Sequence, residues 1–179
     1  KGEGVVMCGA VAVLAAALVV GQDDGVVTRM TVAGDGTDMN WLLSADARQY
    51  DWVDGRYAWG TGSLRINGEA FSWRRPAEAG GVRVSVERTA TGGVLEERYT
   101  FANVTNYPVT LTEIDIHTPF NDNFPPKSAE KFNRRCFAHV WPGGDAGWVA
   151  ALRISGQAPH LGLAVTEGTL SGYELKERA

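Results

Sequence analysis

The feature that most constrains the fold is a series of short strand-like segments separated by turns rich in glycine and asparagine. Residues 82–88 (VRVSVER) alternate apolar and polar side chains, as a half-buried strand does. Asn67 and Gly68 suit the two-residue turn of a β-hairpin, because both positions must accept positive φ. No segment after residue 21 has the apolar period of an amphipathic helix. The sequence therefore predicts an all-β protein, an antiparallel two-sheet β-sandwich of the supersandwich type with about nine or ten strands.

Further strands are expected at residues 26–32, 56–66, 69–73, 95–102, 137–141, 148–154 and 160–166. Between residues 109 and 116 the apolar positions change from odd to even numbers. Either a β-bulge near Thr112 and Glu113 resets the register, or this strand is buried on both faces. Both alternatives suit two stacked sheets.

The status of the N-terminal segment is open. Residues 5–20 form an uncharged run rich in Ala and Val, shorter than the roughly 20 residues of a membrane-spanning helix. The run has features of a signal-peptide core, of a buried strand or helix, and of mistranslated sequence ahead of the true domain. Residues 1–21 are therefore kept apart from the sandwich domain predicted for residues 22–179. The sandwich domain is expected to be truncated ahead of a catalytic domain.

Composition excludes some classes of function. The net charge of −4 argues against a nucleic-acid partner, which usually requires a basic surface. No membrane partner is predicted, and a cytoplasmic and an exported location are both open. The two cysteines, Cys8 and Cys136, are too few for a disulfide framework, and no Cys or His spacing is typical of a metal site. No metal or cofactor is therefore predicted.

Three clusters, residues 115–125, 135–145 and 158–168, each contain one of the three histidines. Each lies where an apolar run meets Pro or Gly, and polar groups at strand ends commonly form binding sites. The alternative is turn residues, with 121–123 as an Asx-type turn, and histidines satisfied in the core. The guanidinium fork of Arg135 suits an acidic sugar. The predicted substrate-binding residues are Asn121, Asp122, Asn123, Arg135, His139, Trp141 and His160.

Four segments carry a family resemblance: 99–105 (YTFANVT), 116–124 (IHTPFNDNF), 135–141 (RCFAHVW) and 159–168 (PHLGLAVTEG). They resemble the galactose-mutarotase-like N-terminal supersandwich of bacterial multi-domain glycoside hydrolases, of a β-glucuronidase type. The resemblance covers the chain from residue 24 onward. It implies a downstream (α/α)6 six-hairpin barrel that carries the catalytic acids, while the sandwich braces and partly lines the glycan cleft. No catalytic residue is assigned within this chain.

Two other functions remain open. The first is a stand-alone carbohydrate-binding module that stacks sugars on Trp141, Trp148 and Phe124, because the apolar face of a pyranose matches an aromatic ring. Its hydroxyl partners would be residues 121–123 and His139. The second is an aldose-epimerase-like enzyme, which needs an acid–base pair such as a histidine with Glu113 or Glu167.

Overall fold

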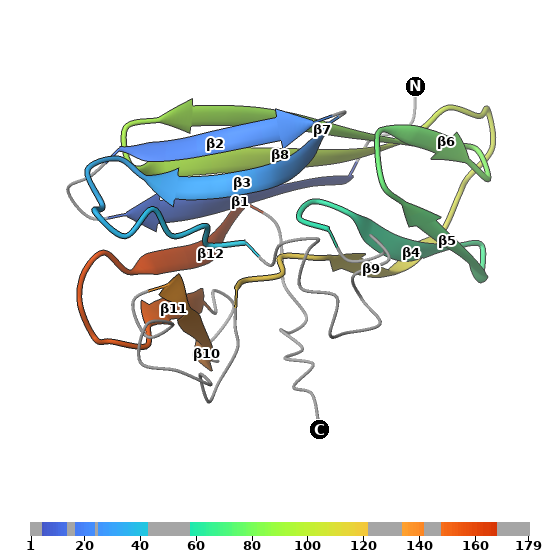
Figure 1. Cartoon of the computed structure of the whole chain (residues 1–179). Helices are drawn as coiled ribbons and strands as arrows, with labels where there is room; N and C mark the ends of the chain where they lie inside the picture. The colour runs from blue at the N-terminus through green and yellow to red at the C-terminus, as the bar shows by residue number, and fades with distance from the viewer. Residues whose placement is uncertain are drawn as a thin grey trace.

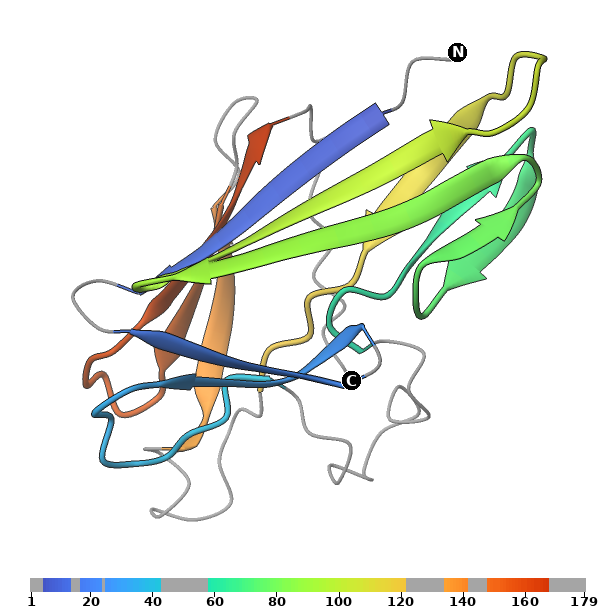
Figure 2. The ribbon, with the colours of Figure 1, turned by 90° about the horizontal axis from the view of Figure 1, so that it is seen from above.

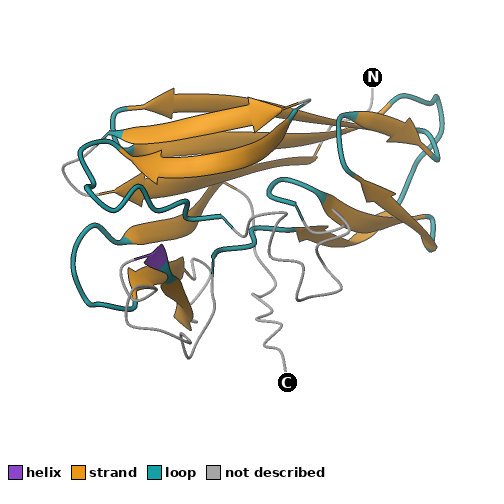
Figure 3. Ribbon diagram, viewed as in Figure 1, coloured by secondary structure: helices purple, strands orange, loops and turns teal. Residues whose placement is uncertain are grey.

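The computed structural model describes residues 5–13, 17–23, 25–42, 58–121, 134–141 and 148–167. These residues form strands joined by turns and loops (Figure 3). None of the helical structure among them is long and apolar enough to cross a membrane. The strands are β1 (Val5–Val13), β2 (Leu18–Asp23), β3 (Val26–Val32), β4 (Gly62–Ile66), β5 (Glu69–Trp73), β6 (Ala77–Ala79), β7 (Val82–Thr91), β8 (Val94–Asn103), β9 (Leu111–Ile116), β10 (Cys136–Trp141), β11 (Trp148–Arg153) and β12 (Leu161–Glu167).

The strands form a β-sandwich with one large and two small sheets (Figure 1). The large sheet has the order β10-β11-β12-β1-β8-β7-β6, and its strand pairs are antiparallel. The small sheets have the orders β2-β3 and β5-β4-β9. Both pack on the same face of the large sheet, as the view from above also shows (Figure 2). The predicted two-layer antiparallel architecture is confirmed.

Two core clusters fill the space between the layers. On β8, Leu95 joins the first cluster with residues of β2, β3, β10, β11 and β12. Phe101 joins the second cluster with residues of β4, β5 and β7. Edge-to-face ring pairs strengthen both clusters, with Trp59 and Phe120 at 5.2 Å and Trp73 and Phe101 at 5.6 Å between centroids. The alternation of buried and exposed residues along β8 thus supplies one side of both cores.

The sequence located most strands and turns correctly. The hairpin between β4 and β5 is confirmed, with φ of 50° at Asn67 and 87° at Gly68. The predicted bulge is also confirmed: Ile66 pairs with Leu111 and Gly62 with Ile116, so the β9 side of this pairing contains one extra residue. Glu113 adopts a φ of 50° at this point. The bulge, not burial on both faces, therefore explains the change of parity.

Three strands differ from the expectation. Residues 5–13 form β1, which lies between β12 and β8 in the middle of the large sheet, and residues 18–23 form β2. The strand interpretation of the N-terminal run is thus the one that the structure shows. The strand expected at 56–66 begins only at Gly62, because the backbone turns at Gly60 with a φ of 83°.

Gly62 is the glycine with the least room for a side chain. A Cβ there would collide with the carbonyl oxygen of Asp115 and the indole ring of Trp73. We expect Gly62→Ala to lower the free energy of unfolding by roughly 3 kcal/mol, because neither neighbour can move without breaking the β4–β9 pairing. Gly36→Ala is the matched control, since no atom lies within 4 Å of its Cβ position. Urea denaturation of both variants checks this, and equal midpoints would contradict it.

Candidate functional site

The candidate site lies where segments distant in sequence meet at the ends of β10 and β11. Asn121 N donates to Trp41 O at 2.8 Å, and Cys136 N donates to Asn121 O at 3.1 Å. Ile154 N donates to the carbonyl oxygen of Arg135 at 3.0 Å. These backbone bonds hold residues 41, 121, 135 and 154 in a row. The loops that carry the predicted site residues are thereby fixed relative to one another.

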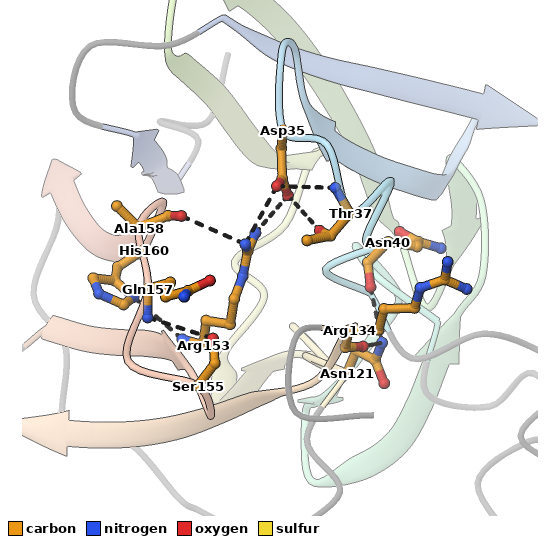
Figure 4. Close-up of polar contacts among 10 residues, drawn as sticks. All are labelled: Asp35, Thr37, Asn40, Asn121, Arg134, Arg153, Ser155, Gln157, Ala158 and His160. Atoms are coloured by element: carbon orange, nitrogen blue, oxygen red, sulfur yellow. Dashed lines mark hydrogen bonds and ion pairs between the residues drawn. The ribbon is translucent and has the colours of Figure 1, made fainter. Parts of the chain in front are cut away.

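Asn121 is buried and acts as a bridge within this row. Its Nδ2 donates to Asn40 O at 2.9 Å and to Arg134 O at 3.2 Å (Figure 4). Its Oδ1 accepts a hydrogen bond from Nη1 of Arg135, which is half-buried. Both amide hydrogens and the amide oxygen are therefore used inside the protein. The amide holds three chain segments together and orients the Arg135 guanidinium.

Beside it lies a buried ion pair between Asp35 and Arg153. Their side chains are only 5% and 2% exposed, and both guanidinium ends donate to the carboxylate (Figure 4). Thr37 adds a hydrogen bond from Oγ1 to Asp35 at 2.9 Å. The guanidinium carbon also lies 5.8 Å from the ring centroid of Trp41, which is cation–π geometry. This pair joins the loop after β3 to the end of β11.

The Asp35 carboxyl is held in its charged form. Burial acts to raise its pKa, but hydrogen bonds from Arg153 and Thr37 and the charge of Arg153 outweigh burial and lower the pKa. A buried carboxylate with two guanidinium bonds is a structural anchor. It is not poised to exchange a proton near neutral pH.

The three histidines have different partners. Arg153 N donates to His160 Nδ1 at 3.2 Å, so the proton of the neutral ring is on Nε2. The Thr61 hydroxyl donates to Ala58 O at 2.8 Å. Nδ1 of His117, 3.0 Å from the same hydroxyl, is therefore the donor in that contact. His139 is exposed, and its ring centroid lies 6.0 Å from that of Phe137.

The structure brings together only some of the predicted residues. Asn121 and Arg135 are in contact, and His160 lies against the adjoining Arg153 backbone. His139 points to the opposite side of β10 from the buried Cys136, so this strand does not pair the thiol with the imidazole. Asp122, Asn123 and Phe124 lie outside the described residues. Trp141 is described only through its backbone, which pairs with Trp148.

Asp35, Trp41 and Arg153 are the site residues that sequence reasoning missed. Arg153 had a detectable signal, because it shares the inward parity of Val149 and Ala151 on β11. A charged residue at a core position implies a buried partner. Asp35 had none, since it lies in a Gly-rich turn of ordinary composition. Within the described residues, no group of three or more His, Cys, Asp or Glu side chains is close enough to hold a metal ion.

Comparison with solved structures gives a likeness that extends over most of the chain. The chain is similar to a polysaccharide lyase, BACCELL_00875, with a TM-score of 0.76 and 33% sequence identity. The match covers 86% of this chain and 25% of the lyase chain, so this chain spans about a quarter of the lyase's length. No protein-family model and no curated protein matches the chain. The likeness is consistent with a domain of a carbohydrate-active enzyme, whereas the galactose-mutarotase-like classification stays a prediction.

Removal of the Asp35 charge tests the anchor. We expect Asp35→Asn to lower the free energy of unfolding by about 3 kcal/mol at pH 7, because Arg153 is then buried without its counter-ion. The folded pKa of Asp35 lies below its unfolded value of about 3.9. The stabilisation is therefore present above that value and is lost as the pH falls through the folded pKa. The wild type and the variant should then converge in acid.

The matched control is Asp38→Asn, which removes the exposed ion pair of Asp38 with Arg29. Exposed pairs contribute at most about 1 kcal/mol, so this variant should unfold close to the wild type at every pH. Guanidinium chloride denaturation between acid and neutral pH measures all three proteins. An Asp35→Asn variant as stable as the wild type at pH 7 would show that the pair contributes nothing.

Proposed function

We propose that this chain is the β-sandwich part of a polysaccharide-cleaving enzyme, in which it braces a separate catalytic domain and partly lines the glycan cleft. The observation that carries the proposal is the 33% identity to a polysaccharide lyase over 86% of the chain, at a TM-score of 0.76. Fold alone does not define function. Here the likeness extends to a third of the aligned residues, and that supports a shared type of substrate.

The described carboxylates support bracing and not catalysis. Asp35 and Glu97, whose side chains are almost fully buried, are each paired with an arginine. Glu113 is exposed and paired with Arg65 at 2.7 Å. Cleavage of a glycosidic bond by acid–base chemistry needs groups free to exchange protons with the substrate. We therefore assign the chemistry to residues beyond those described, in a downstream domain.

The class of reaction is the point on which the two likenesses differ. The family resemblance of the sequence predicts a glycoside hydrolase, whereas the structural neighbour is a lyase. A lyase cleaves its substrate by elimination and leaves a double bond in one product, whereas a hydrolase adds water. We favour elimination, because the lyase likeness rests on aligned coordinates over most of the chain.

Product analysis with the full-length protein tests the proposal. The enzyme is incubated with polysaccharides that contain uronic acids and with neutral ones. Both the reducing ends and the ultraviolet absorbance of unsaturated products are measured. Unsaturated products support elimination, and reducing ends without unsaturation support hydrolysis. Failure to cleave any polysaccharide would refute the proposed function.

Arg135 is the residue through which the sandwich would contact an acidic sugar. Its Nη1 is held by Asn121, so the rest of the fork is oriented in advance for a carboxylate. We expect Arg135→Lys in the full-length protein to weaken the binding of an oligogalacturonate about tenfold, since lysine keeps the charge but loses the fork. Isothermal titration calorimetry measures the affinity.

Arg134→Lys is the control, because Arg134 is exposed and its backbone oxygen, not its side chain, bonds to Asn121. This variant should bind the oligogalacturonate as the wild type does. Thermal unfolding of both variants separates loss of binding from loss of structure. Unchanged affinity in Arg135→Lys would mean that Arg135 only anchors Asn121.

A further inference from the structure

The outward face of β10 and β11 carries four large side chains, named here the aromatic strip: Phe137, His139, Trp148 and Leu152. Phe137 is 38% exposed, Trp148 44% and Leu152 40%. The intervening Ala138, Val149 and Ala151 are buried in the first core cluster. The strip therefore lies on the side of the large sheet that faces away from the second layer.

The strip has the dimensions of a short oligosaccharide site. Phe137 pairs with Leu152 across the two strands, and Trp148 lies four residues from Leu152 along β11. Four residues of a strand span about 13 Å. The rings of Phe137 and His139 are 6.0 Å apart and tilted by only 31°. They form a nearly continuous platform at one end of the strip, and Trp148 lies at the other end.

The surface between these ends is low. Ala150 pairs with His139 on one side and with Gly162 on the other, and Ala164 pairs with Trp148. No atom lies within 4 Å of the position that a Cβ of Gly162 would occupy. Small side chains beside large aromatic ones leave room for a sugar ring to lie against Trp148 or Phe137.

Charge indicates which sugars suit this surface. The outward residues described on β10, β11 and β12 include no Asp, Glu, Lys or Arg. Arg153, on the same strand as Trp148, points into the core, where its side chain is 2% exposed. The strip thus offers no cation to pair with a uronic acid. Its rings match the C–H faces of neutral pyranoses, and the His139 ring nitrogens can bond hydroxyl groups.

We propose that the aromatic strip is a second glycan-binding surface, which binds a run of neutral sugar residues of the polysaccharide. This inference rests on the proposed function, since the likeness to a polysaccharide lyase favours a glycan over a protein partner. Phe137 and Trp148 stack on sugar rings, and His139 bonds to hydroxyl groups between them. The surface would hold the polymer while its acidic units are bound and cleaved elsewhere.

The test uses Phe137→Ala and Trp148→Ala in the full-length protein. Tyr107→Ala is the matched control, because Tyr107 is an aromatic residue of 55% exposure in the loop between β8 and β9. Isothermal titration calorimetry measures affinity for cellohexaose, mannohexaose, xylohexaose and hexagalacturonate. We expect the wild type to bind at least one neutral hexasaccharide. Both strip variants should bind it at least tenfold more weakly, and Tyr107→Ala should bind it like the wild type.

Other outcomes would overturn the assignment. These are no binding of any neutral hexasaccharide by the wild type, equal affinity in both strip variants, or a loss confined to hexagalacturonate. A concentration-dependent assembly in sedimentation velocity that Trp148→Ala abolishes would assign the strip to a protein interface instead. Neutral binding that depends on the strip, in a full-length protein that cleaves no polysaccharide, would support the strip and refute the proposed function. Thermal unfolding confirms that the variants are folded.

Discussion

The buried ion pair between Arg88 and Glu97 joins the two cores of the sandwich. Both side chains are only 6% exposed. Glu97 also accepts a hydrogen bond from Trp59 Nε1 at 2.8 Å, and Arg88 Nη1 donates to Gly25 O at 2.6 Å. Removing two charges from water is costly, and it is tolerated only where such partners are in place. The pair therefore fixes β7, β8, the start of β3 and the segment at Trp59 in a single arrangement.

The segment after Trp59 transmits this constraint to the second layer. A Cβ at Gly60 would collide with the Arg88 guanidinium, so the backbone passes directly against the ion pair. Trp73 Nε1 donates to Gly60 O at 3.2 Å, and Gly60 N donates to His117 O at 3.0 Å. The sheet β5-β4-β9 is thus positioned by a glycine that only a close backbone approach explains. This accounts for the position at which β4 begins.

Local patterns predicted what is local in this fold, and long-range pairs were beyond them. The period of two placed β7 and β8, and the change of parity located the bulge at Glu113. The continuous apolar run of β1 has no such period, and its place beside residues 161–167 follows from pairing across the whole chain. Asn121 was expected in an Asx-type turn. It instead bonds to Asn40, 81 residues away, and Asp35 bonds to Arg153, 118 residues away.

Strand β11 connects the buried anchor to the exposed strip, because alternate residues of a strand point to opposite faces. Arg153 is fixed from the core side by Asp35, while Leu152 and Trp148 lie on the outward side. The hydrogen bond from Ile154 N to Arg135 O ties the end of the same strand to the segment that carries Asn121. A surface for stacking on sugars gains affinity when its rings need not be ordered on binding. The polar contacts that sequence reasoning assigned to substrate therefore contribute most by holding β10 and β11 rigid beneath that surface.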